Sequence, residues 1–149
     1  MIPTRSSQAP SDEPRVDAMK IEYYGYCWIC GEKNKGGLQL KFDLNKRTKT
    51  IKTSFIPTET YQGYDGIVHG GILSALLDEA MAKLAFELGY NAVTAMLNVR
   101  FKNPAKVKEK LTIRGEITQA NRRLVLAKAT IHREDGTLIA EGDSKLVRK

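Results

Sequence analysis

The sequence HGGILSALLDEAMAKLAFEL, which runs from His69 to Leu88, decides the fold. Ala, Leu, Met, Glu and Lys dominate it, which favours a helix, and the glycine that follows is a typical helix-ending residue. The charges at Glu79, Lys83 and Glu87 are four residues apart, so they should form one stripe that faces water. Residues 72–77 are apolar nearly all round, which predicts that other elements cover this part of the helix on several sides.

The segments on either side of this helix have the patterns of β-strands, either alternation of apolar and polar residues or richness in Thr and Ile. Two strands are expected before the helix and four after it, over residues 38–44, 50–56, 92–101, 111–118, 124–132 and 137–147. Turn signals separate them, and Asp135-Gly136 is a strong hairpin dipeptide. This order predicts an α+β protein with an antiparallel sheet of about six strands curled around one long central helix. A second copy of the chain is a natural way to cover a free edge of such a sheet.

The composition fits one soluble domain, since the chain has 149 residues, of which 42% are hydrophobic and 28% charged. We expect an irregular leader over residues 1–17, where three of the five prolines lie, and one domain over residues 18–149. No stretch without Asp, Glu, Lys or Arg exceeds 12 residues, whereas a membrane-spanning helix needs about 20 apolar residues. The first residues also lack the apolar core of a signal peptide, so a cytoplasmic location without membrane association is expected. The net charge of +7 favours anionic partners.

One carboxylate lies on the apolar side of the predicted helix. At about 100° per residue, Asp78 points roughly 140° from the middle of the charged stripe, on the same side as Ser74. A buried carboxylate without a partner is strongly unfavourable, so Asp78 is either a structural group bonded to Ser74 and a nearby strand, or a general base that lines a pocket. Upstream, His69-Gly70-Gly71 leads into the helix, where free backbone N–H groups at the positive end of the helix dipole can bind an anion or an oxyanion.

These residues belong to a longer pattern. The segment QGYDGIVHGGILSALLDEAM over residues 62–81, with CWICGEKNKGGLQL before it and VTAMLNVRFKNPA after it, resembles the hotdog-fold acyl-CoA thioesterases of the phenylacetate-pathway type. The similarity covers residues 27–147. It implies an enzyme that hydrolyses a fatty-acyl or aryl-acyl CoA thioester to the free acid and CoA. It also implies a homodimer or a tetramer of two dimers, in which Asp78 and Gly70 of one site come from different subunits.

The resemblance implies a role for each matched position. Asp78 matches the catalytic carboxylate that activates the attacking water, and Gly70 matches the glycine whose backbone N–H polarises the thioester carbonyl. Thr94 falls where relatives carry a Ser or Thr that positions the water or the carboxylate. His69 opens the motif and either orients the thioester or braces the turn. A carboxylate, a water and an N–H donor are sufficient for this hydrolysis without a metal or another cofactor.

Further candidates for substrate binding surround this motif. Many relatives carry an Asn at the position held here by Gly63, and Gln62 beside it is a candidate to replace that side chain. Exposed Lys and Arg residues near strand ends and turns are candidates to hold the phosphates of CoA, because charge-assisted contacts to phosphate are strong. The full set of binding candidates is Gln62, Gly71, Asn98, Lys102, Arg122 and Arg123.

Other functions use some of the same residues. Glu79 is the second choice as the base, because its place on the charged stripe favours a solvated role. A dehydratase of the same fold, acting on a 3-hydroxyacyl thioester, would use His69 with Asp78 or Glu79 as acid and base. A protein that binds acyl-CoA without turnover is a third alternative, but it gains nothing from a carboxylate on the apolar side of the helix.

Two further groups of residues have some features of a metal site or a nucleic-acid site. Cys27 and Cys30 have the spacing of half a zinc site, but His69 and His132 do not form a second close-spaced pair, so buried thiols and no metal are expected. The aromatic residues between positions 23 and 28 are expected to pack within the protein rather than to stack on nucleobases, and no binding of nucleic acid is expected.

Overall fold

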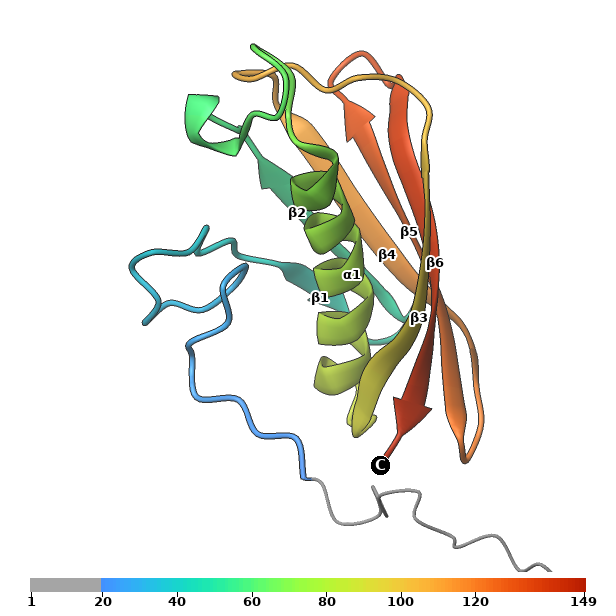
Figure 1. Cartoon of the computed structure of the whole chain (residues 1–149). Helices are drawn as coiled ribbons and strands as arrows, with labels where there is room; N and C mark the ends of the chain where they lie inside the picture. The colour runs from blue at the N-terminus through green and yellow to red at the C-terminus, as the bar shows by residue number, and fades with distance from the viewer. Residues whose placement is uncertain (1–19) are drawn as a thin grey trace, which may run out of the picture.

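A computed structural model describes residues 20–149, and the predicted leader over residues 1–17 lies outside the described part. The strands form one antiparallel sheet in the order β1-β2-β4-β5-β6-β3, and helix α1 packs against one face of it (Figure 1). The elements are β1 Asp43–Asn45, β2 Thr50–Phe55, a 3-10 turn at Glu59–Tyr61, α1 Gly70–Glu87, β3 Ala92–Phe101, β4 Leu111–Ala120, β5 Leu124–Arg133 and β6 Leu138–Arg148. This arrangement confirms the predicted six-stranded hotdog architecture with one long helix.

Helix α1 begins and ends close to the predicted bounds, with His69 as its N-cap and Leu88 as its C-cap. Gly89 follows with a φ of 86°, a conformation that glycine adopts without steric penalty. The N–H groups of Gly89 and Tyr90 then bond to carbonyls of the last helical turn and satisfy them. Among residues 20–149, no helix combines the length and the apolar character that crossing a bilayer requires.

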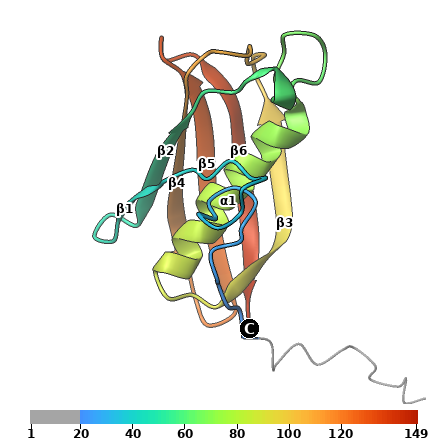
Figure 2. The same cartoon turned by 90° about the vertical axis from the view of Figure 1, so that its left-hand side faces the viewer.

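The core of the protein lies between α1 and the sheet. The helix buries Leu73, Leu76, Leu77, Ala80, Met81, Leu84 and Ala85. Buried residues from the strands facing the helix include Ile51, Leu111, Ile113, Val125, Ile131 and Leu146. The segment that leads into β1 passes over the opposite side of α1, where Figure 2 shows it in front of the helix. This segment contacts the helix at Glu79, Lys83 and Phe86, so the second cover lies over the second half of the helix and not over residues 72–77, where it was expected.

The prediction that the charged stripe of α1 faces water is wrong for two of its three residues. Glu79 and Lys83 are half-buried, whereas Glu87 is exposed. Lys83 Nζ lies 3.3 Å from a carboxylate oxygen of Glu87, one helical turn later. The segment around Cys27 covers the stripe, and the Cys27 thiol donates a hydrogen bond of 3.4 Å to Glu79. Helical periodicity predicts which side of a helix is polar, but it does not predict whether another segment of the chain covers that side.

The strand predicted over residues 38–44 is present only at its end, as β1. Its apolar residues are partly buried and its polar residues exposed, as the alternation predicts. However, the N–H groups of Leu38 and Leu40 bond to the carbonyls of Trp28 and Ile29, not to β2. Gln39 also has a φ of 52°, which interrupts the extended backbone. The alternation therefore predicted the burial correctly and the backbone pairing incorrectly.

Leu77→Ala should strongly destabilise the fold. Leu77 is fully buried in the core, and removing a buried leucine side chain lowers the free energy of unfolding by about 2–5 kcal/mol because a cavity is left. Urea unfolding measures this quantity. Ile56, which is 58% exposed, provides the control, because Ile56→Ala should lower the free energy of unfolding by less than about 1 kcal/mol. Similar losses in the two variants would contradict this account of the core.

Candidate active site

Asp78 and Thr94 form the centre of the candidate site. Asp78 lies in the middle of α1 and Thr94 near the start of β3, and the Thr94 hydroxyl donates a hydrogen bond of 2.8 Å to the Asp78 carboxylate. Both residues are half-buried. The β3–β6 register shifts between Thr94 and Met96, and such a bulge commonly re-aims a side chain beside an active site. A purely structural Asp78 was expected to bond both to a nearby strand and to Ser74. The bond to the strand is present, through Thr94, but the Ser74 hydroxyl donates to the carbonyl of Gly70 at 2.8 Å and not to Asp78.

Asp78 and Thr94 line a pocket of about 360 Å³ between α1, the start of β3 and the N-terminal segment. Its wall consists of Ile21, Glu22, Tyr23, Cys27, Cys30, Asp78, Glu79, Ala82, Lys83, Phe86, Ala92, Val93 and Thr94. Aliphatic and aromatic groups from all three elements contribute to this wall, so an apolar acyl or aryl group could lie beside the carboxylate. Phe86 belongs to this pocket, whereas Leu73, Leu77 and Met81 of the same helix lie in the core.

The N-terminus of α1 presents a second functional group. His69 Nδ1 accepts a hydrogen bond of 2.8 Å from the Gly71 N–H, so the histidine braces the turn and occupies the donor of Gly71. The next two N–H groups, of Ile72 and Leu73, bond to the His69 carbonyl. Within residues 20–149, the Gly70 N–H has no acceptor. It is therefore free to donate to a developing oxyanion at the positive end of the helix.

One chain does not bring the carboxylate and the free N–H together. Asp78 and Gly70 are eight positions apart on α1, which corresponds to about 12 Å along a helix at 1.5 Å per residue. Gly70 is also absent from the wall of the pocket that contains Asp78. A thioester carbonyl bound to one of these groups could not reach the other in the same subunit.

The other binding candidates lie apart from this pocket. Gln62 Oε1 accepts a hydrogen bond of 3.0 Å from the Gly66 N–H and so closes the loop before α1. The exposed side chain of Asn98 on β3 donates to Asp143 at 3.1 Å. Gly71 is exposed, and its N–H is already bonded to His69. These three residues therefore have structural partners within the chain.

The three basic candidates do not gather in one place. Lys102 follows the end of β3 and lies 3.9 Å from Glu141. Arg122 and Arg123 are exposed in the β4–β5 turn, which lies beside the start of β3 because both neighbour the end of β6. The two ends of a ten-residue strand are roughly 30 Å apart. Within one subunit, Lys102 and the two arginines therefore cannot hold the same phosphate.

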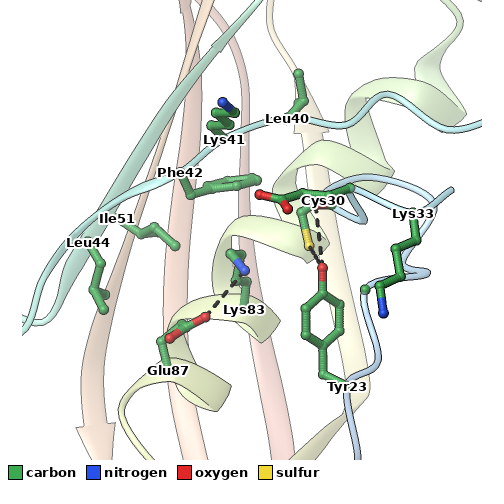
Figure 3. A pocket seen from close by; sticks show the side chains of 12 residues that line it. Tyr23, Cys30, Lys33, Leu40, Lys41, Phe42, Leu44, Ile51, Lys83 and Glu87 are labelled. Atoms are coloured by element: carbon green, nitrogen blue, oxygen red, sulfur yellow. Dashed lines mark hydrogen bonds and ion pairs between the residues drawn. The ribbon is translucent and has the colours of Figure 1, made fainter. Parts of the chain in front are cut away.

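A larger pocket of about 500 Å³ lies beyond Tyr23 and Cys30 (Figure 3). It has Lys33 and Lys41 on its wall but neither Asp78 nor Thr94, which line only the smaller of these two pockets. Burial and a hydrogen bond with Glu79 raise the pKa of the Cys30 thiol to about 12. The thiol of the free protein is thus protonated at neutral pH and is a poor nucleophile.

Sequence reasoning missed the part of the wall contributed by residues 21–23 and by the Cys27–Cys30 turn. Tyr23 contacts the edge of Phe86, with ring centroids 6.1 Å apart, and this contact helps to hold the segment against α1. The aromatic cluster at positions 23–28 was the available signal, but the expectation that it packs within the protein is wrong for most of it, because Tyr23 and Trp28 are 43% and 42% exposed and Tyr24 and Tyr26 are 66% and 63% exposed. Its position over the second half of α1 depends on tertiary contacts that no local pattern specifies.

Comparisons with known proteins are consistent with this architecture. Residues 65–140, about half of the chain, match the family model of the thioesterase superfamily. The protein belongs to this superfamily. The human acyl-coenzyme A thioesterase THEM5 is 32% identical over 81 residues, which cover 54% of this chain. The match spans 33% of the length of that relative.

Two solved structures share the fold. A hypothetical thioesterase from Streptococcus pneumoniae, solved with coenzyme A, superposes with a TM-score of 0.68 at 20% identity and covers 73% of this chain and 86% of its own. The PaaI protein from the phenylacetic acid degradation operon of E. coli superposes with a TM-score of 0.65 at 20% identity and covers 68% of this chain and 73% of its own. The resemblance to proteins of the phenylacetate-pathway type is thereby confirmed at the level of the fold.

Proposed function

We propose that the protein is an acyl-CoA thioesterase that uses Asp78 as its general base. The observation that carries the proposal is the half-buried Asp78 carboxylate, held by Thr94 on the wall of a largely apolar pocket. In this mechanism the carboxylate takes a proton from water as the water attacks the thioester carbonyl. The Gly70 N–H of a second subunit stabilises the oxyanion, and CoA leaves as the thiol.

The free edge of the sheet supports a dimer. β3 is an edge strand of ten residues, and Met96 and Phe101 on it are 47% and 54% exposed. A long edge strand with exposed apolar residues tends to pair with another chain. Antiparallel pairing of two β3 strands around a two-fold axis would extend the sheet across both subunits and place the two helices on the same face.

The same pairing would complete the site. If the two-fold axis lies near Leu97 and Asn98, Thr94 of one subunit comes opposite the partner's Phe101. Phe101 lies directly beside Gly70, since a Cβ built on Gly70 would be 3.4 Å from its ring. The partner's Gly70 would then approach Asp78 of the first subunit. The dimer thus supplies the N–H donor that each chain lacks in its own pocket, and a pair of such dimers would form the tetramer.

The dimer also bears on the CoA phosphates. Antiparallel β3 pairing brings the partner's Lys102 to the end of the sheet where Arg122 and Arg123 of the first subunit lie. The net charge of +7 and the exposure of these side chains support contacts with the anionic part of the substrate. We therefore propose that the phosphates bind between subunits. Lys102 of one subunit and Arg122 and Arg123 of the other could then contact the same CoA, although these residues lie far apart within one chain.

Thr94→Val should lower kcat by about tenfold to a hundredfold, because a hydrogen bond to a charged group contributes about 1.5–3 kcal/mol. The hydroxyl of Thr94 positions the carboxylate, so KM should change less than kcat. Steady-state kinetics with an accepted acyl-CoA measure both constants. Thr94→Ser keeps the hydroxyl and should stay within a few-fold of the wild type. Equal activity of the valine and serine variants would contradict a positioning role for the hydroxyl.

The proposed function is tested with a panel of short-chain, long-chain and aryl CoA thioesters. Release of free CoA thiol, detected with a thiol reagent, is expected for at least one class. Consumption of a 3-hydroxyacyl-CoA with loss of water but no free thiol would indicate the dehydratase instead. Binding without either reaction would indicate an acyl-CoA-binding protein, and both of these results would contradict the thioesterase.

We also propose a cytoplasmic location. Both cysteines are free thiols, as is usual in a reducing compartment, and the proposed substrate is a soluble CoA thioester. Fractionation of cells should recover the protein with cytosolic markers. Its recovery in an organelle or membrane fraction would contradict this location.

A further inference from the structure

The turn at Cys27–Cys30 and the middle of α1 bring three ligand-type groups together. The sulfur atoms of Cys27 and Cys30 and a carboxylate oxygen of Glu79 all lie within 4.8 Å of one another. Glu79 is 52 positions away from Cys27 in the sequence, and the direct contact between them is 3.4 Å. Cys30 is 8% exposed, and the other two residues are half-buried. The catalytic proposal uses none of these three groups.

The backbone of the turn is built to aim both sulfur atoms at the helix. The Gly31 N–H bonds to the Cys27 carbonyl at 2.8 Å, and the Ile29 N–H donates to the Cys27 sulfur at 3.4 Å. A donor directed at sulfur favours negative charge on it. Any Cβ at position 31 would lie 2.4–2.6 Å from backbone atoms of Cys27 and Gly25. Only glycine therefore fits this tight turn.

The surroundings provide matching charge. Lys83 lies one turn after Glu79 on α1, beside Cys30 and Tyr23 (Figure 3), with its ammonium group 5.4 Å from the centre of the Tyr23 ring. Two thiolates and one carboxylate around a divalent cation leave one net negative charge, which the ammonium group of Lys83 can balance. The Tyr23 hydroxyl lies 3.6 Å from the Cys30 sulfur and is placed to donate to a bound thiolate.

We propose that Cys27, Cys30 and Glu79 bind one zinc ion, with water in the fourth position. Sulfur and carboxylate ligands in tetrahedral geometry are typical of zinc, and Zn–S distances near 2.3 Å place two sulfur ligands about 3.8 Å apart. The three ligand atoms already lie within 4.8 Å of one another, so small side-chain rotations are enough to bring them to the distances of a zinc site. Binding releases the two thiol protons to solvent and involves no oxidation or reduction.

This zinc site departs from the expectation of no metal. The sequence shows only half of a zinc site, because the third ligand comes from a helix residue without any motif spacing to the cysteines. The ion would fasten the N-terminal segment to α1, and that segment forms one wall of the pocket that contains Asp78. The ion would therefore hold this wall of the pocket in place, and its presence does not depend on the proposed thioesterase activity.

The test measures the metal directly. Full-length protein without an affinity tag, kept under a thiol-free reductant, is incubated with Zn²⁺, desalted and analysed by mass spectrometry for metal content. We expect about one zinc ion per chain and a higher thermal midpoint than in the metal-free protein. The double variant Cys27→Ser/Cys30→Ser should lose both effects. Glu79→Gln should weaken zinc binding at least about tenfold, whereas Glu87→Gln, on the exposed part of the same helix, should bind zinc like the wild type.

A second measurement does not depend on the folding of any variant. Titration of the wild type with Co²⁺ should produce a thiolate-to-cobalt charge-transfer band and the visible bands of a tetrahedral site, both removed by excess Zn²⁺. The proposal is overturned if the reduced wild type retains less than about a tenth of one zinc ion per chain. It is also overturned if the cobalt complex lacks the thiolate band, or if the double cysteine variant retains as much zinc as the wild type. None of these results bears on hydrolysis by Asp78.

Discussion

Replacing Asp78 by Asn should lower kcat for acyl-CoA hydrolysis by about 10²–10⁴-fold, the range over which a positioned general base contributes to rate. The amide cannot accept a proton from water at neutral pH. Its oxygen can still accept the hydrogen bond that Thr94 donates to Asp78 at 2.8 Å. The substitution therefore removes the basic group but keeps the shape and the main contact of the side chain. Release of CoA thiol under saturating substrate measures the loss.

The controls for Asp78→Asn separate chemistry from folding. The variant should have the circular dichroism spectrum of the wild type and a thermal midpoint within a few degrees of it, because Asp78 is only half-buried. Asp43→Asn, at the exposed edge strand β1, makes the same chemical change far from the pocket and should keep full activity. A folded Asp78→Asn variant with wild-type turnover would exclude Asp78 as the base.

Gly70→Pro should lower kcat by about a hundredfold or more, the usual effect of removing one oxyanion donor. Proline has no N–H, and Gly70 is the first residue of α1, the helical position that tolerates proline best. His69 before it has φ −59° and ψ 132°, a conformation that proline favours in the preceding residue. The donor can thus be removed with little change to the helix. The same thiol-release assay measures the effect.

Gly70→Ala is the matched control for this prediction. Alanine keeps the N–H, and its Cβ would lie 3.4 Å from the ring of Phe101, an ordinary van der Waals contact. The alanine variant should therefore retain much more activity than the proline variant. Equal losses in the two variants would show that space at position 70, and not the N–H, is what the reaction requires.

The sequence predicted the fold well because its strongest signals are local. Helix α1 combines favourable residues with a cap at His69 and an end signal at Gly89, and the late strands alternate between clear turns. The 38–44 segment failed because two neighbouring carbonyls, of Trp28 and Ile29, took the hydrogen bonds that a strand would have made. Alternation specifies which side chains are buried, and it leaves the backbone partner open.

The site was harder to predict, because it depends on contacts between distant segments. Helical spacing separated Asp78 from the charged stripe, but Asp78, Glu79 and Lys83 line the same pocket. The resemblance suggested Thr94 as a residue that positions the carboxylate, and the two side chains are hydrogen-bonded. The same spacing assigned Glu79 to water, whereas the segment around Cys27 covers it. The separation of Asp78 from Gly70 along α1 follows from helix geometry alone, and it is the reason that a second subunit enters the proposal.

The central claim is that each site combines Asp78 of one subunit with the partner's Gly70. A heterodimer of Asp78→Asn and Gly70→Pro subunits, each with a different affinity tag and purified through both tags, tests it directly. Such a dimer has one site with both substitutions and one site with neither. The account predicts about half of the wild-type kcat per dimer, although each parent homodimer is nearly inactive. A heterodimer as inactive as its parents would contradict it, because a site within one chain would be damaged in both subunits.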